Sequence, residues 1–169
     1  MKFSYEKKIV ILSLMAVVLC SIQTALYAGE EEIDVKDLPS AVLAAFQKAY
    51  PNAEIKGASK EDEDGRIVYE IESVDGKQKR DILYSEEGKV LEVEEQIAFK
   101  MLPDAIKKTI KDKYPEAEIE KAEKITKNGT INYEVLVETD DETLEIVLDP
   151  QGKIVKSESS DEEEEESEE

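Results

Sequence analysis

The phrase YPNAEI at residues 50–55 returns as YPEAEI at residues 114–119, and the same offset of 64 positions runs through most of the chain without a gap. About a third of the paired positions are identical. The matched features include Ile33 with Ile97, Leu38-Pro39 with Leu102-Pro103, Gly65 with Gly129, Tyr69-Glu70 with Tyr133-Glu134, and Gly88-Lys89 with Gly152-Lys153. A register held this long indicates an internal duplication, and its period exceeds that of ordinary solenoid repeats. We therefore predict two tandem copies of one module, residues 30–93 and 94–157.

Each copy is expected to begin with one helix. A Leu-Pro pair opens it, and proline is tolerated in the first turn because its missing N–H is not needed there. Every fourth position is then apolar, with Leu38, Val42, Phe46 and Tyr50 in the first copy and Leu102, Ile106, Ile110 and Tyr114 in the second. This stripe predicts one buried helix face. Pro51 and Pro115 end the helices, because a residue before proline avoids the helical region.

Alternating patterns after each helix predict strands. In the first copy every second residue, at Ile67, Tyr69 and Ile71, is expected to face one side of a sheet, and the residues between them the other side. Glycines at 65, 76 and 88 mark the turns between strands. Each copy therefore reads as one helix packed on about four short antiparallel strands, which is an α+β unit. The two copies can join edge to edge into one continuous eight-stranded sheet with one face left open.

At this level the pattern LPxAV…YPxAxI…G.I.YE….GK resembles the PepSY-like domains grouped with the beta-lactamase-inhibitor-like family. The resemblance covers residues 33–93 and 97–157 and rests on scaffold positions such as Leu38, Tyr50 and Gly88 with their partners. It implies an exported bacterial protein that binds or inhibits another protein through a sheet. The tandem arrangement is similar to beta-lactamase inhibitory protein. That inhibitor has disulfides, which this mature chain is expected to lack, and no inhibitory loop is recognisable.

The first 28 residues have the pattern of a secretory signal peptide. Basic residues precede an apolar run at residues 9–20, which is too short for a membrane span of about 20 residues. We expect cleavage after Ala28 and a periplasmic or secreted product that is no longer attached to the membrane. Two alternatives stay open: an uncleaved anchor, or lipidation at Cys20. Cleavage would remove this cysteine, the only one in the chain, so no disulfide would support the core.

The charge and composition of the chain limit the kinds of partner it can bind and the kinds of reaction it can catalyse. Lys and Arg total 22 against 42 Asp and Glu, which gives a net charge of −20. Such a chain repels nucleic acid and attracts basic proteins, basic peptides or cations. Histidine is absent, which excludes histidine-dependent catalysis and His-ligated metals. A carboxylate pair could still hydrolyse glycosides, but short modules are expected to offer little room for a cleft that raises carboxylate pKa values. We therefore predict a non-catalytic protein without a cofactor.

The open sheet face is the predicted binding surface. By the two-residue period of a strand it mixes apolar side chains with carboxylates, which suits a basic protein or peptide of the cell envelope. Its predicted contact residues are Val68, Glu70, Glu72, Leu83, Asn132, Glu134, Leu136, Glu145 and Val147. An ordinary solvated sheet face is the simpler interpretation of the same pattern.

Cation binding is the alternative function from a different class, together with buffering of envelope stress. The segment KEDEDGR at residues 60–66 does not fit an EF-hand, because Lys60 and Ile71 fall where acidic ligands are required. No metal-ligating residues are therefore predicted, and only weak, diffuse binding of divalent cations such as calcium is expected. The acidic segment 158–169 is predicted to be a disordered, solvating tail.

Overall fold

The structure is a computed structural model that describes residues 31–63 and 65–159. Its strands are β1 (Glu31–Glu32), β2 (Glu54–Glu63), β3 (Arg66–Asp75), β4 (Gln78–Ser85), β5 (Val90–Gln96), β6 (Glu118–Lys127), β7 (Thr130–Glu138), β8 (Thr143–Leu148) and β9 (Ile154–Ser159). Its helices are α1 (Ser40–Ala49) and α2 (Asp104–Lys113), and each follows a short 3-10 turn, η1 (Val35–Asp37) or η2 (Phe99–Met101).

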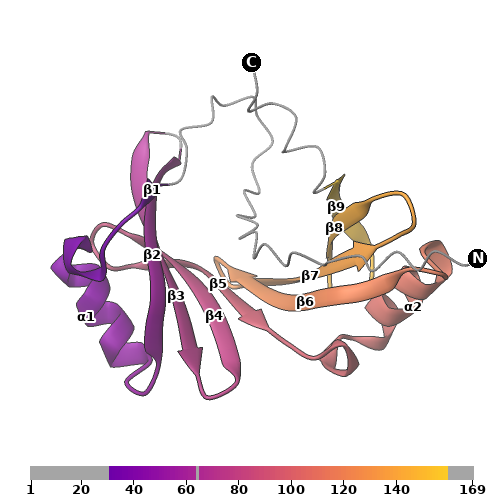
Figure 1. Ribbon diagram of the computed structural model, residues 1–169, viewed down its shortest axis with the longest axis horizontal. Helices are drawn as coiled ribbons and strands as arrows, with labels where there is room; N and C mark the ends of the chain where they lie inside the picture. The colour runs from indigo at the N-terminus through magenta and orange to yellow at the C-terminus, as the bar shows by residue number, and fades with distance from the viewer. Residues whose placement is uncertain (1–30, 64, 160–169) are drawn as a thin grey trace, which may run out of the picture.

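All the described strands form one antiparallel sheet in the order β1 to β9, so every strand pairs with its neighbour in the sequence. Figure 1 shows this sheet curving, with both helices outside the curve and the helix-free face on the concave side. The two halves of the chain join where β5 pairs antiparallel with β6. The predicted α+β class, antiparallel strands and continuous sheet are confirmed. The sheet has nine strands rather than eight, because the two-residue β1 adds itself to the edge of β2.

The helices begin and end close to the predicted positions. Pro39 and Pro103 occupy the N-cap positions, so helical residues begin one position later, at Ser40 and Asp104. Tyr50 caps the C-terminus of α1, where its backbone N–H donates to the carbonyl of Phe46 at 2.8 Å. Because Pro51 follows directly, the helix cannot continue. The Tyr-Pro phrase therefore ends each helix before the chain turns into the next strand.

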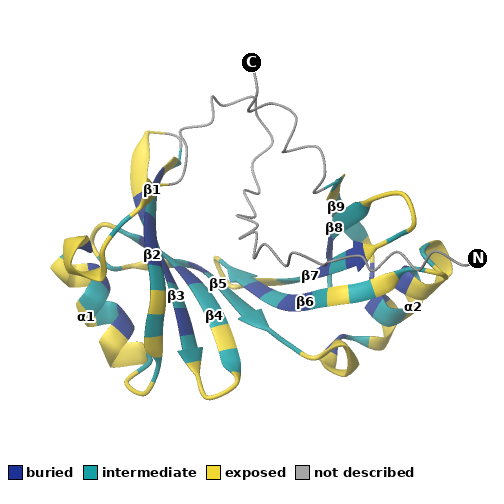
Figure 2. Cartoon of the chain, in the orientation of Figure 1, coloured by how far each residue is buried: buried dark blue, intermediate teal, exposed yellow. Residues whose placement is uncertain are grey.

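Each helix packs on its own half of the sheet and makes a separate core. Val42 and Phe46 of α1 pack against Ile71, Ile82 and the wholly buried Tyr84. Ile106 and Ile110 of α2 pack against the equivalent positions in β7 and β8, namely Val135, Val137, Ile146 and Leu148. Figure 2 shows buried segments on both helices and on the strands of the sheet. The predicted helix stripes are therefore core residues, although Tyr50 and Tyr114 lie only half-buried at its border.

On the helix side, ion pairs link the two cores across the junction. Arg80 on β4 donates from Nε to Oε1 of Glu95 on β5 at 3.1 Å, and Lys124 on β6 contacts Oε2 of Glu95 at 3.4 Å. The Arg80 guanidinium also lies 5.2 Å from the centre of the Tyr50 ring, within range of a cation–π interaction. These contacts join the first helix, both junction strands and the second half of the chain.

Several predicted boundaries fall beside or outside the described elements. The boundary between residues 93 and 94 lies inside β5, and the division into two modules stays a prediction. Residues 158 and 159, expected to begin the tail, are the end of β9, and the rest of the tail lies outside the described residues. The predicted signal peptide also lies outside them. Within residues 31–63 and 65–159, no helix is both long and apolar enough to span a membrane.

Candidate functional site

The helix-free face carries many of the carboxylates of the described strands. Side chains of a strand alternate between faces, and the cross-strand register continues this alternation from one strand to the next. The carboxylates assigned to this face include Glu61, Glu70, Glu72, Asp81, Glu92, Glu94, Glu123, Glu134, Glu145 and Glu158. Basic residues there are fewer and include Arg66, Lys79, Lys121, Lys127 and Lys156. The concave face is therefore strongly acidic, as the sequence pattern indicated.

The predicted contact residues all lie on this face, but they are less accessible than expected. Val68, Glu134 and Val147 are buried, with exposed fractions of 3%, 3% and 8%. The other six, Glu70, Glu72, Leu83, Asn132, Leu136 and Glu145, are half-buried. A partner could reach these six at their edges, whereas the three buried side chains would have to move first. Their role in partner binding stays a prediction.

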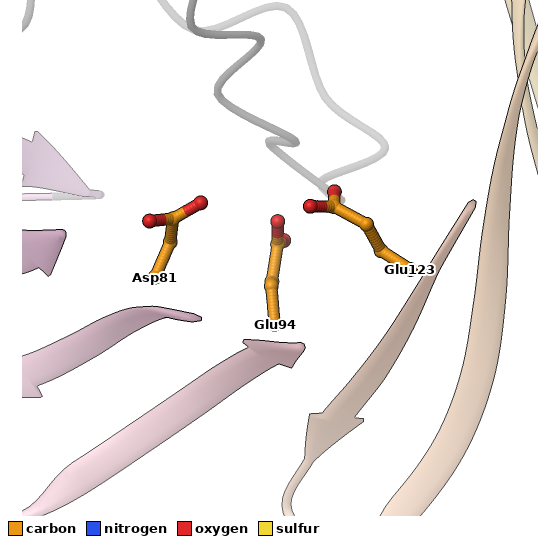
Figure 3. A group of neighbouring side chains, drawn as sticks. All are labelled: Asp81, Glu94 and Glu123. Carbon is orange, nitrogen blue, oxygen red and sulfur yellow. The ribbon is translucent and has the colours of Figure 1, made fainter. Parts of the chain in front are cut away.

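The centre of the face holds a tight group of carboxylates. One oxygen each from Asp81, Glu94 and Glu123 lies within 4.8 Å of the others. Figure 3 shows the three side chains rising to the same side of the sheet, with Glu94 between the other two. They come from β4, β5 and β6, the strands on both sides of the junction. We refer to these three residues as the central carboxylate group.

Strand register explains why these three side chains meet. Asp81 and Glu94 are direct partners across β4 and β5. Glu123 pairs with Gln96, two residues beyond Glu94 on β5, and therefore lies diagonally across from Glu94. Diagonal neighbours on one face are about 7–8 Å apart at the backbone, which long side chains can span. Glu134 on β7 is in turn the direct partner of Glu123, so it adds a fourth carboxylate beside the group.

This crowding changes the pKa values of the carboxylates. Burial, followed by the charges of Glu123, Glu134, Glu92 and Glu70, raises the pKa of Glu94 to about 9. Burial and the neighbouring Glu123 raise the pKa of Asp81 to about 6. Burial, Glu145 and Glu123 raise the pKa of Glu134 to about 8. Removing water disfavours the charged form of an acid, and adjacent negative charges disfavour it further. Glu94 and Glu134 therefore hold protons at neutral pH when no cation is bound.

Lys121 partly compensates the charge of the group, and Lys79 and Lys156 act more weakly on Asp81 and Glu134. Nζ of Lys121 lies 2.8 Å from Oε2 of Glu123. Burial works against the charged form of Lys121, but the charges of Glu123, Glu134 and Glu94 outweigh it and hold the Lys121 pKa above its ordinary value. A second pair joins Lys127 to the buried Glu92 at 2.7 Å, farther along the same two strands. The four carboxylates outnumber the ammonium groups that act on them, so the centre of the face is negative once the acids ionise.

This group was not predicted from the sequence. Little room was expected for a cleft that raises carboxylate pKa values, but here the pKa values rise on the sheet face itself, where acids from neighbouring strands are buried together. Asp81 and Glu94 could have been assigned to the face by counting two residues from Leu83 and Glu92. Glu123 could not, because its position depends on the β5–β6 pairing and on the irregularity between Ile119 and Lys121. Placing Glu94 at a module boundary also separated it from Asp81.

The two halves are not equivalent at this place. Positions 57 and 59 of β2 correspond to positions 121 and 123 of β6, but they carry glycine and serine instead of lysine and glutamate. A Cβ on Gly57 would lie 2.3 Å from Oε1 of Glu72, so the side chain of Glu72 lies over the glycine. β2 also has β1 as its outer neighbour, whereas β6 lies beside β5. Among the described residues, such a group is therefore found only at the junction.

Solved structures with this fold come from species of Bacteroides. A protein from Bacteroides eggerthii described as "putative periplasmic" matches with a TM-score of 0.62 and 13% identity, over 72% of this chain and 88% of that one. A DUF2874 family protein from Bacteroides uniformis gives a TM-score of 0.61 and 15% identity over the same shares. A BLIP-like protein from Bacteroides fragilis gives 0.56 and 17%, over 71% of this chain and 84% of that one. At these identities the likeness shows a common fold. A comparison with curated proteins gave no match.

Family models also match the sequence in both halves. A model described as "Peptidase propeptide and YPEB domain" matches residues 39–94. A second model, described as "Putative beta-lactamase-inhibitor-like, PepSY-like", matches residues 68–156, which is more than half of the chain and includes the whole central carboxylate group. The resemblance inferred from the repeated motif is thus confirmed, and the chain belongs to this PepSY-like, beta-lactamase-inhibitor-like family.

Proposed function

We propose that the chain is an exported, non-catalytic binding protein that captures a basic protein or peptide on its helix-free face. The observation that carries the proposal is the distribution of charge. Both helices cover one side of the sheet, while the concave side gathers carboxylates from strands β2 to β9. Such a face attracts positively charged partners over distances of about 10 Å at moderate salt. The BLIP-like and periplasmic descriptions of proteins with this fold agree with this proposal.

We further infer that the binding face is assembled from two copies of one module. Each element from η1 to β5 has a counterpart 64 positions later, from η2 to β9, and the helices have equal lengths. The left-handed glycine turns at Gly65 and Gly88 also recur at Gly129 and Gly152. A duplicated module doubles the area of a sheet without changing its local packing.

A non-catalytic role is supported by residue chemistry. The sequence has no histidine, and its one cysteine lies in the segment predicted to be removed. Buffering of envelope stress stays a prediction with no described residue assigned to it.

Charge reversal on the concave face tests the capture proposal. The variant Glu70→Lys with Glu145→Lys changes two half-buried carboxylates of the face. We expect it to lose at least about tenfold in affinity for a lysine-rich peptide, measured by fluorescence anisotropy, and to lose partners in a pull-down from the envelope fraction.

The matched control is Asp112→Lys with Glu116→Lys. Asp112 lies in α2 and Glu116 in the turn directly after it, both are exposed, and the variant has the same net charge. Equal loss of affinity in both double variants would mean that overall charge, rather than the concave face, attracts the peptide.

A further inference from the structure

We propose that Asp81, Glu94 and Glu123 form a Ca²⁺ site at the centre of the concave face, with Glu134 as a fourth carboxylate beside it. This inference goes beyond capture of a basic partner and does not depend on it. It also differs from diffuse attraction by an acidic surface, because it assigns the ion to one place in the fold. The site spans β4, β5 and β6, so both halves of the chain supply ligands.

The spacing of the ligand oxygens fits calcium. Ca²⁺ takes carboxylate oxygens at about 2.3–2.6 Å, so oxygens on opposite sides of the ion are at most about 5.2 Å apart. The three oxygens here lie within 4.8 Å of one another. Three carboxylates can supply up to six oxygens if each binds through both. Mg²⁺ requires a near-ideal octahedron at about 2.0–2.1 Å, which side chains from three different strands of a curved sheet do not provide as readily.

An unpartnered buried carboxylate beside the group gives independent support. Glu134 is only 3% exposed, and its Oε2 has no hydrogen-bond partner among the described residues. It pairs with Glu123 across β6 and β7 on the same face, and its charge acts on Glu94. A buried acidic oxygen without a partner costs free energy, which either protonation or a bound cation relieves. The arrangement is therefore short of positive charge.

Lys121 indicates where that positive charge belongs. Its ammonium contacts Oε2 of Glu123 and also acts on Asp81 and Glu134. An ammonium group can donate up to three hydrogen bonds but carries one positive charge, whereas a divalent cation carries two and binds carboxylate oxygens directly. We therefore expect Ca²⁺ and Lys121 to compete for Glu123, with the flexible lysine side chain moving aside when the ion binds.

Calorimetric titration tests the site directly. The chain is stripped with EDTA and titrated with Ca²⁺ at pH 8 in 0.15 M salt, which screens the acidic surface and favours ionised ligands. We expect one saturable event with a Kd of about 10⁻⁴–10⁻³ M, typical of extracellular calcium modules, together with a rise in Tm. Mg²⁺ should bind more weakly. A titration without a saturable event, or equal affinity for Mg²⁺ and Ca²⁺, would overturn the proposal.

Three variants locate the ion. Glu94→Gln and Glu123→Gln keep the shape of the side chains but remove a ligand charge, and each should weaken Ca²⁺ binding by at least about tenfold. Glu120→Gln removes the same charge from an exposed position of β6 and should leave the affinity unchanged. If Glu94→Gln and Glu120→Gln bind Ca²⁺ equally well, the ion lies elsewhere and the assignment is wrong.

The variant Lys121→Gln gives a readout that loss of folding cannot imitate. Removing the competing ammonium should strengthen Ca²⁺ binding by about threefold or more, because like charges no longer repel in the site. Unchanged or weaker binding in a folded Lys121→Gln protein contradicts the competition that the site implies. None of these outcomes bears on peptide capture, which is measured with the Glu70 and Glu145 variants in EDTA.

Discussion

At the scale of single residues, the strongest feature is the stacking of acids on one face of adjacent strands. Asp81, Glu94, Glu123 and Glu134 come from four consecutive strands. The two-residue alternation of a strand correctly predicted that Glu134 lies on the open face. It did not predict that Glu134 is buried there. Burial depends on the curvature of the sheet and on the conformations of neighbouring long side chains. Neither can be predicted from the sequence of a single strand.

Glu94 should make stability depend on pH. Its pKa rises from 4.5 in the unfolded chain to about 9 in the folded one. The folded state therefore binds the extra proton between these values, so the contribution of Glu94 to stability is fully present below about pH 4.5 and is lost as the pH rises towards 9. In EDTA, Glu94→Gln should lack this loss and be more stable than wild type by about 1–3 kcal/mol at pH 8, with almost no difference at pH 4.5. Urea denaturation at both pH values measures this.

The control for this prediction is again Glu120→Gln, which lowers the net negative charge equally from an exposed position. If both variants gain the same stability at pH 8, relief of general repulsion explains the result and Glu94 has no special environment.

At the scale of elements, local sequence determined helices and turns well. The Leu-Pro opening, the apolar stripe and the Tyr-Pro stop bounded each helix to within about one residue, because these signals act through local backbone sterics. The two-residue β1 was not predicted, since such a short strand exists only through its pairing with β2. The β5–β6 junction likewise depends on contacts that no local pattern carries.

The turn between β4 and β5 shows how tightly a helix is held against the sheet. Gly88 has φ +78°, and a Cβ there would lie 2.4 Å from the carbonyl oxygen of Ala41 in the first turn of α1. Gly76, in the turn between β3 and β4, has φ +64° with open space around it. Both glycines adopt a left-handed backbone conformation, but only at Gly88 is there also no space for a side chain.

Alanine substitution separates these two effects. Gly76→Ala should lose about 1 kcal/mol of unfolding free energy through its left-handed backbone alone. Gly88→Ala should lose about 2–4 kcal/mol, because the helix must also shift away from the turn. Chemical denaturation of both variants checks this, and equal losses would show that α1 does not pack closely on the turn.

At the scale of the whole molecule, one sheet presents two different faces. The helix side holds two hydrophobic cores linked by Arg80, Glu95 and Lys124, and it provides stability. The concave side concentrates negative charge and provides the proposed binding surface. The repeat predicted the overall architecture, but it treated the halves as equivalent. The central carboxylate group could not be predicted from equivalent halves. It forms because β5 pairs with β6, which brings together side chains that neither half has alone.

The central claim is that both halves together build a cation-binding centre on the concave face. A crystal structure of the chain grown with Ca²⁺ at pH 8 tests it most directly. We predict an ion with oxygens of Asp81, Glu94 and Glu123 at about 2.3–2.6 Å, and Lys121 turned away from Glu123. The claim would be contradicted if, at saturating Ca²⁺, Lys121 were still paired to Glu123 and no ion lay between the three carboxylates.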